Sequence, residues 1–163
     1  MKIKKATIDD AEVLGKLCLE IQGIHVKLAP HIFREPTHQD LVDTFRERIA
    51  APDYTAFLVF DGDIPIGYIV LHVLQKPENV FTYKRTILEI DHIHIVEQYR
   101  RRGNCKKLFA KALEVARSSG IEDIQLGVWA RNDRAVAAFK ALGFKRQFSI
   151  MSLENTENLE STN

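Results

Sequence analysis

The sequence predicts one α/β domain, an α+β mixed sheet that is mostly antiparallel and has helices on both faces. The chain has 163 residues, enough for one domain with a sizeable core. Its apolar residues switch between period-two and helical spacing in the order β-α-α-β-β-β-α-β-α-β. Consecutive strands in the middle favour antiparallel pairing, whereas the strand–helix–strand unit through residues 107–119 requires a parallel strand pair.

The composition argues against several classes of protein. A hydrophobic content of 45% with 28% charged residues is ordinary for a globular domain. The formal net charge of +1 does not fit a surface built for nucleic acid, and no apolar run is long enough for a membrane span. No apolar region follows the basic N-terminal residues, so we expect no signal peptide. Because Cys18 and Cys105 match no zinc spacing, we expect a reduced cytoplasmic protein without a metal site.

The first third of the chain is expected to form a strand and two helices. Residues 2–7 alternate enough for a short strand. Asp9 or Asp10 is a suitable cap for the helix that follows, and Thr37 is the expected N-cap of a second helix that ends near Ala50. The apolar residues that share one face of the first helix are Val13, Leu14, Leu17, Ile21 and Ile24.

A β-hairpin and a central strand are expected next. Residues 54–60 and 64–74 read as strands, and residues 61–63, Asp-Gly-Asp, form the turn between them. Residues 75–79 read as a polar loop, and the central strand covers residues 88–96.

The last third is expected to alternate helices and strands. Gly120 and Gly143 follow helical patterns and are suited to end them, and Asn132 with Asp133 caps the second of these helices. The expected elements are a helix over 107–119, a strand over 122–129, a helix over 134–142 and a strand over 144–153. The domain then spans residues 1–154, and residues 155–163 are a polar tail.

The segment from residue 87 to residue 109 carries the first functional signal. Its β-branched strand runs through a basic, glycine-containing loop into the start of a helix. The N–H groups of a first helical turn have no partner within the helix, and the helix dipole favours negative charge there. We therefore expect a pyrophosphate-bearing cofactor at residues 100–106.

Three motifs in this order identify a family resemblance. Residues 100–105 read RRRGNC, similar to a Gln/Arg-x-x-Gly-x-Gly/Ala loop. The strand over 90–96 runs into EQYR at 97–100, similar to V-x-P-E-Y-R, and residues 132–144 read NDRAVAAFKALGF, similar to N-x-x-A-x-x-F-Y-x-x-x-G-F. The chain resembles the GNAT superfamily of N-acetyltransferases over nearly its whole length. The resemblance implies a GNAT-like fold with a splayed parallel strand pair, and acetyl transfer from acetyl-CoA to an amine.

The resemblance also assigns roles to individual residues. Backbone groups of the central strand pair with the pantetheine arm, the loop amides cradle the pyrophosphate, and Asn132 contacts pantetheine. The residues expected to bind acetyl-CoA are Ile93, His94, Ile95, Arg100, Arg101, Arg102, Gly103, Asn104, Cys105, Lys106, Asn132 and Phe139. Cys105 stands where the family has Gly or Ala, and its place at a helix N-terminus beside cationic residues favours a lowered thiol pKa.

Two carboxylates are the candidate catalytic residues. An alkylamine has a pKa near ~10.4, so a general base is useful for removing its proton. Asp91 and Glu89 are two positions apart on a strand and share a face, and both match positions at which family members carry acidic or histidine residues. His92 and His94 are expected on the opposite face as packing residues, although a strand bulge could bring His92 into the site.

Several alternatives remain open. Phe139 stands where the family often has a proton-donating tyrosine. The CoA thiol can leave as a thiolate or take a proton from water, Tyr83 or Tyr99 can supply one, or the protein is a catalytically weak acetyl-CoA-binding or sensing module. The acceptor is a small-molecule or peptide amine, and its expected region is not plainly acidic, which disfavours a strongly polycationic acceptor. A nucleic-acid or membrane partner is not expected, whereas a homodimer is compatible with the resemblance.

Overall fold

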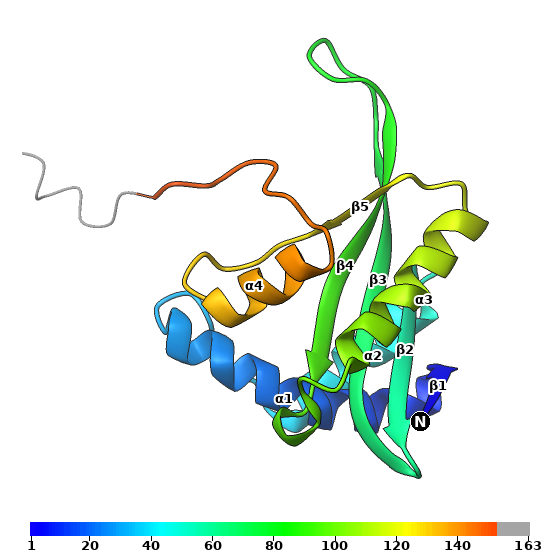
Figure 1. Cartoon of the computed structure of the whole chain (residues 1–163), viewed down its shortest axis with the longest axis vertical. Coiled ribbons are helices and arrows are strands. Elements are labelled where there is room, and N and C mark those ends of the chain that lie inside the picture. The colour runs from blue at the N-terminus through cyan, green and yellow to red at the C-terminus, as the bar shows by residue number, and fades with distance from the viewer. Residues whose placement is uncertain (153–163) are drawn as a thin grey trace, which may run out of the picture.

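The computed structural model describes residues 1–152 as a five-stranded sheet with helices on both faces (Figure 1). The strands are β1 (Lys2–Lys5), β2 (Tyr54–Asp61), β3 (Ile64–Lys76), β4 (Arg85–Ile95) and β5 (Asp123–Leu126). The helices are α1 (Ala11–Leu28), α2 (His38–Ala50), α3 (Asn104–Ser118) and α4 (Asp133–Ala141), with 3-10 turns η1 (Ile8–Asp10) and η2 (Glu97–Tyr99). The strands lie in chain order, and all neighbours are antiparallel except β4 and β5. The predicted mixed α/β sheet with one parallel pair is confirmed.

Alternate residues of β3 build two hydrophobic cores. Tyr68 and Val70 pack with apolar residues of α1 and α2, whereas Ile69 and Leu71 pack with apolar residues of α3. This alternation follows from the period of two in a strand. Strand β3 is buried on both faces, which explains its continuous apolar run.

The predicted N-cap Thr37 and the predicted end at Gly120 are confirmed, whereas α3 begins at Asn104 instead of residue 107 and Asp10 makes no side-chain cap to α1. The Thr37 hydroxyl accepts the Asp40 N–H, and the Asp40 carboxylate accepts the Thr37 N–H in return. Gly120 has φ 63°, and the N–H of the next residue, Ile121, donates a hydrogen bond to the Ala116 carbonyl in the last turn of α3. These local signals fix where the helices begin and end.

Strand β4 leaves part of one edge free. It pairs with β3 along its length but with β5 only from Ile87 to Ile90. Beyond Ile90 the two parallel strands separate, so the last five residues of β4 have no neighbour on that side among the described residues. The free edge ends directly before the basic loop and the start of α3.

Several predicted strand limits are wrong. Residues 144–152 form no strand, because no described segment offers a ladder for their N–H and C=O groups, and Phe144 packs instead against Phe109 and Phe139. The rest of that predicted strand, the domain end and the tail lie at residues 153–163, outside the described part. Strand β5 stops at Leu126, and the predicted loop at 75–79 begins later because β3 and β4 continue pairing to Lys76 and Arg85.

Candidate active site

A β-bulge in β4 shapes the candidate active site. Ile90 pairs with Leu71 and His92 pairs with Val70, so Asp91 is an extra residue between two partners that are adjacent on β3. Asp91 and His92 therefore both face α2, where they contact Arg48 and Phe45 respectively. The expectation that His92 and His94 face away from Asp91 is wrong, since His94 pairs with Tyr68 and contacts Glu20 of α1, and the bulge considered for His92 is present.

The two predicted catalytic carboxylates are already paired with basic groups. Asp91 Oδ2 lies 2.7 Å from Arg48 Nη1, and the two side chains are 21% and 26% exposed. Glu89 Oε2 lies 3.7 Å from Nδ1 of His72, a residue of β3. Asp91 and Glu89 thus contact different side chains, and the Asp91 carboxylate forms an ion pair with a guanidinium.

His92 is the titratable group that β4 presents to a cavity. Its Nδ1 lies 3.3 Å from the hydroxyl of the buried Tyr68, which orients the ring. The pKa of His92 is lowered to about 4, mainly by burial; the Asp91 charge opposes the shift and the Arg48 charge favours it. The imidazole is therefore neutral at pH 7, and its lowered pKa makes it a weak base.

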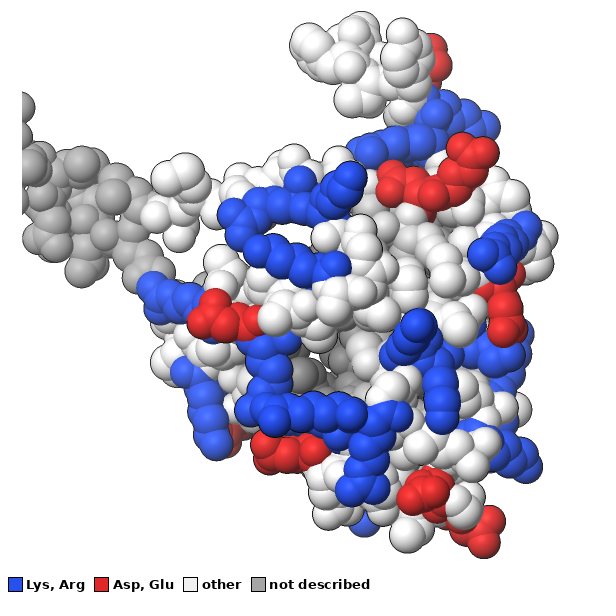
Figure 2. All heavy atoms as spheres, viewed as in Figure 1, with Lys and Arg blue, Asp and Glu red and all other residues white. Residues whose placement is uncertain are grey.

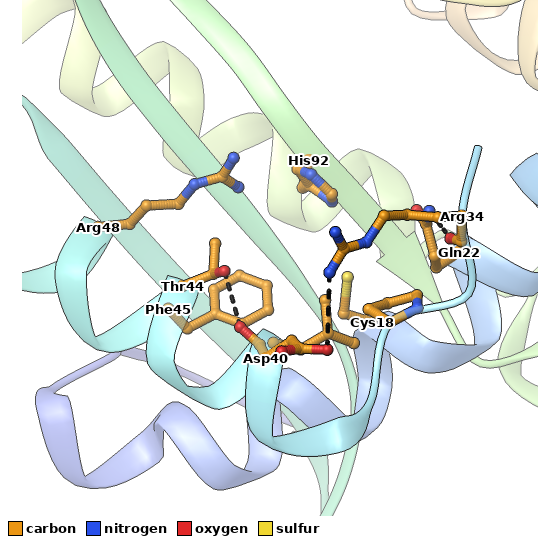
Figure 3. Close-up of a pocket in the computed structure, with 10 residues that line it drawn as sticks. Cys18, Gln22, Arg34, Asp40, Thr44, Phe45, Arg48 and His92 are labelled. Carbon is orange, nitrogen blue, oxygen red and sulfur yellow. Dashed lines mark hydrogen bonds and ion pairs between the residues drawn. The ribbon is translucent and has the colours of Figure 1, made fainter. Parts of the chain in front are cut away.

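The cavity next to His92 has a volume of about 300 Å³ and lies between α1, α2 and β4 (Figure 3). Its apolar wall includes Phe45 and the buried Cys18, whose thiol pKa is raised by burial. Figure 3 shows the guanidinium of Arg48 directed toward His92. The lining residues are Cys18, Gln22, Arg34, Pro36, Asp40, Leu41, Thr44, Phe45, Arg48 and His92. Neither predicted carboxylate lines this cavity.

Backbone groups of Ile93 point to the free edge of β4. The Val96 N–H donates to Ile66 on β3, and successive residues of a strand direct their backbone groups to opposite sides. Ile93 and Ile95 therefore face the free edge, whereas His94 directs its carbonyl toward Gly67 on β3. The Ile95 carbonyl accepts a 2.7 Å hydrogen bond from Arg100 Nε, which leaves the Ile93 N–H and C=O and the Ile95 N–H directed outward.

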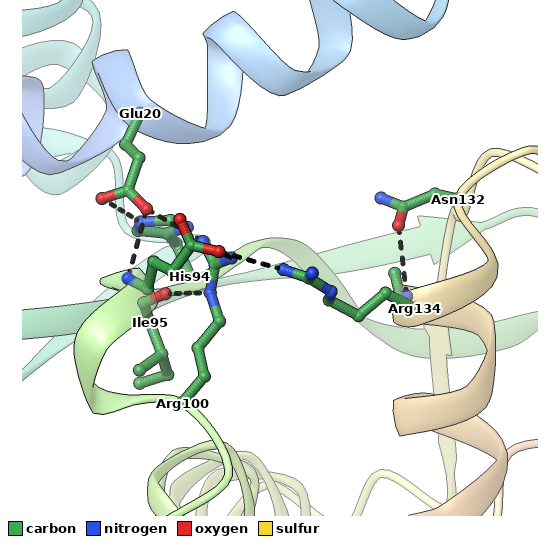
Figure 4. A network of polar contacts seen from close by, with 8 residues as sticks. Glu20, His94, Ile95, Arg100, Asn132 and Arg134 are labelled. Atoms are coloured by element: carbon green, nitrogen blue, oxygen red, sulfur yellow. Dashed lines mark hydrogen bonds and ion pairs between the residues drawn. The ribbon is translucent and has the colours of Figure 1, made fainter.

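Arg100 lies in a polar network with α1 rather than in the exposed part of the loop. Figure 4 shows Glu20 reaching from α1 toward β4 and Arg100. Its carboxylate lies 2.9 Å from Arg100 Nη2 and 3.4 Å from Nε2 of the buried His94. Arg134 of α4 lies 3.6 Å from Glu97 at the other side of this network. Sequence reasoning missed Glu20, because its position on α1 gives no local sign that it faces β4.

The loop before α3 has the geometry of an anion site. Arg101 has φ 60° and Gly103 has φ 75°, and no side chain caps the first turn of α3. A loop with positive φ angles before a helix N-terminus directs backbone N–H groups toward one concavity. Asn104 is 2% exposed and donates to Tyr99 O at 2.9 Å, which holds the loop on the strand end. Figure 2 shows Lys and Arg side chains around a hollow on the face that carries α3 and α4.

Comparison with known proteins decides the family. The acetyltransferase (GNAT) family profile matches residues 24–144. The chain belongs to this family. The match includes the bulged strand, the basic loop and α4, so the predicted family resemblance is confirmed.

Solved structures share the fold of this GNAT chain. A mutant of the BH1408 protein from Bacillus halodurans superposes with a TM-score of 0.90 at 26% identity, covering 94% of this chain and 99% of that chain. A tetramutant of the same protein gives a TM-score of 0.89 at 24% identity, with 94% and 99% coverage. The aminoglycoside N-acetyltransferase AAC(6')-Iy in complex with CoA gives a TM-score of 0.71 at 15% identity, covering 95% of this chain and 94% of that chain.

The remaining residues expected at the GNAT cofactor site have structural contacts of their own. Asn132 Oδ1 accepts the Ala135 N–H at 3.2 Å and caps α4, as the sequence indicates. Phe139 is half-buried, with its ring 6.0 Å from that of Phe144. Burial raises the pKa of the Cys105 thiol, so the expected lowering is wrong.

The described residues add two findings about this GNAT domain. None of the helices within residues 1–152 is both long and apolar enough to cross a membrane. In the same part of the chain, no group of three or more His, Cys, Asp or Glu side chains is arranged to hold a metal ion.

Proposed function

We propose that this chain transfers the acetyl group of acetyl-CoA to a primary amine of a small molecule or peptide, by direct attack in a ternary complex. The observation that carries the proposal is the bulge in β4. It directs the neutral His92 into a cavity, while the next residue, Ile93, directs backbone groups to the free strand edge. The proposed proton acceptor, His92, is then followed directly in sequence by Ile93, whose backbone N–H and C=O face the free edge. The similar structures described as aminoglycoside acetyltransferases support a small-molecule amine.

The loop and α3 fit the phosphates of acetyl-CoA. The positive φ angles at Arg101 and Gly103 and the uncapped first turn of α3 suit the pyrophosphate. Arg101, Arg102 and Lys106 are exposed, so their charges are available to phosphate oxygens, whereas Arg100 holds the loop to Glu20. Ile93 would pair with the pantetheine arm. In this proposal Asn104 supports the loop from beneath.

His92 is the proposed proton acceptor, and Asp91 a positioning residue. A bound primary ammonium must lose a proton before its nitrogen can attack a thioester carbonyl. His92 lines the cavity and is neutral, whereas Asp91 is held at 2.7 Å by Arg48. Asp91 and Arg48 would then fix the bulge that aims His92. Glu89 lies farther along β4, beside His72, and is proposed to take no direct part.

The leaving thiolate is proposed to take its proton from water. A thiol pKa near ~8.5 makes CoA a competent leaving group without an enzyme acid. Phe139 has no proton to give, and Tyr83 is 87% exposed at the tip of the β3–β4 hairpin, away from the cavity. The second candidate, a catalytically weak acetyl-CoA-binding module, rests on Phe139 alone. Phe139→Tyr distinguishes the two, since a tenfold or greater gain in kcat would indicate a missing acid.

The test is release of CoA thiol from acetyl-CoA with a panel of amines, including amino acids, peptides and an aminoglycoside. We expect turnover of at least one amine, and a loss of about 10²- to 10⁴-fold in kcat for His92→Gln with acetyl-CoA binding unchanged. A thermal unfolding midpoint near that of the wild type would show that the variant is folded. Tight acetyl-CoA binding with no turnover of any amine would instead favour the binding module.

A further inference from the structure

The two arginine side chains that line the 300 Å³ cavity differ in how closely they are paired with a carboxylate. Arg48 is committed to Asp91 at 2.7 Å. Arg34 is 82% exposed, and its Nη2 lies 3.9 Å from Asp40 Oδ2, which is longer than a hydrogen bond. The cavity thus has one guanidinium that is free to bind an incoming anion.

Asp40 is the one carboxylate among the described residues that line the cavity, and one of its oxygens is already engaged. Its Oδ2 accepts the Thr37 N–H at 2.8 Å as part of the capping box of α2. The hydrogen bonds from Thr37 lower the pKa of the Asp40 carboxyl, so this group is anionic while one of its oxygens is engaged at the helix end. No other carboxylate lines the cavity among the described residues. A ligand with several ammonium groups would find a single carboxylate, partly engaged by Thr37, and two guanidinium groups there.

The backbone that carries Arg34 is held in place while its side chain is not. Gln22 of α1 donates from Nε2 to the Arg34 carbonyl at 3.0 Å. The neighbouring Phe33 ring packs against His25 at 5.0 Å and Trp129 at 5.1 Å between centroids. Figure 3 shows Arg34 on the side of the cavity opposite Arg48, with His92 between them. A guanidinium on a fixed backbone can bind a carboxylate with two parallel N–H groups.

We propose that the acceptor is a primary amine that also carries a carboxylate, of the chemical class of free amino acids and short peptides, and that Arg34 binds this carboxylate. This inference rests on the proposed function. The carboxylate lies at Arg34 and the amine at His92, so the substrate crosses the cavity. The volume of about 300 Å³ is at the lower end of ligand pockets, which suits a small zwitterion better than a multi-ring polycation. The acid group gives affinity, and the amine is the group that receives the acetyl.

The test compares matched acids and amides in steady-state acetylation. The substrates are the common amino acids that have a primary α-amine and a set of dipeptides, each with its C-terminal amide, and one aminoglycoside. The variants are Arg34→Gln and, as a matched control, Arg46→Gln. Arg46 lies on α2 outside the cavity, where it pairs with Glu12 at 3.5 Å and Asp43 at 3.3 Å.

For the wild type we expect kcat/KM to be about 10- to 100-fold higher for an acid than for its amide, the range of a charge-assisted hydrogen-bond pair. Arg34→Gln should reduce this ratio to near one by raising KM for the acid, with kcat retained, and Arg46→Gln should keep the ratio. Equal or better turnover of amides or of the aminoglycoside would overturn the inference while leaving the proposed function intact. Absence of turnover with every amine would overturn both.

Discussion

A side chain at Gly67 of β3 would collide with β4, the strand that carries the candidate site. A Cβ atom added there would lie 2.4 Å from the His94 carbonyl oxygen, 2.6 Å from Ile95 Cδ1 and 3.1 Å from Ile95 Cα. The nearest atom belongs to the backbone of β4, so it cannot rotate away as a side chain could. Gly67→Ala must therefore push β4 away from β3 at the residues that follow the bulge.

The size of the effect follows from these distances. Ordinary contact begins at 3.4 Å, so the strands must separate by about 1 Å. Overpacking of this kind costs about 1–3 kcal/mol, and each weakened ladder hydrogen bond adds about 0.5–1.5 kcal/mol. We expect a loss of about 2–4 kcal/mol in the free energy of unfolding, which lowers Tm by about 5–15 °C for a domain of this size.

Gly23→Ala is the matched control. Gly23 lies within α1, and no heavy atom lies within 4 Å of the position of its added Cβ, so alanine should stabilise the helix by about 0.5–1 kcal/mol. Both variants are compared by thermal and urea unfolding, and by acetyl transfer at a temperature at which both are folded. Gly67→Ala should lose activity even when folded, because His92 and Ile93 move with β4. A Tm within about 1 °C of the wild type for Gly67→Ala would refute the reasoning.

Three further predictions concern the pKa of His92, the backbone of the loop at Arg101 and the Asn132 cap of α4. His92 has a pKa of about 4 in the folded protein and about 6.5 in the unfolded chain, so the unfolded chain binds more protons between these pH values. The free energy of unfolding should therefore fall by up to about 3 kcal/mol as the pH drops from 6.5 to 4. In His92→Phe this dependence, measured by urea unfolding at several pH values, should shrink, and an unchanged slope would contradict the assigned burial. Arg101→Gly should be about 1 kcal/mol more stable than Arg101→Ala, which also removes the charge but keeps a Cβ at φ 60°, and equal midpoints would count against the strained loop. Asn132→Ala should cost about 1 kcal/mol and Asn132→Asp little, so equal losses would show that the cap is not what stabilises α4.

Local signals in the sequence were sufficient for the order of strands and helices from β1 to α4 and for several helix ends. Thr37 and Asn132 identified two N-caps from their own side chains, because capping depends on residues three or fewer positions away. The basic loop before α3 was also local, since a strand, a glycine and a helix start follow one another in the chain. The strand expected at residues 144–152 failed because pairing depends on a distant partner, and residue pattern alone does not reveal whether an edge is within reach.

The contacts at the candidate site were harder to predict because they join residues far apart in sequence. Arg48 meets Asp91 from α2, and Glu20 meets Arg100 from α1. Each pair bears on a role predicted from the sequence. Asp91, expected as a general base, has a cation beside it, and Arg100, expected to bind phosphate, is held away from the exposed part of the loop. Charge alone could not indicate these partners, because the sequence has 23 basic and 22 acidic residues and many pairings satisfy the same pattern.

The bulge explains why one strand can serve both sides of the proposed reaction. In a regular strand the side chains of Asp91 and Ile93 would share a face, and His92 would lie in the α3 core. The extra residue at Asp91 moves His92 to the α1 and α2 face, next to the cavity, and returns Ile93 to the α3 core. The backbone of Ile93 still faces the free edge left by β5. The His92 side chain, proposed to act on the amine, and the Ile93 backbone, proposed to bind the acetyl donor, are thus adjacent. They are adjacent because Asp91 has no partner on β3, and Arg48 holds Asp91 in place.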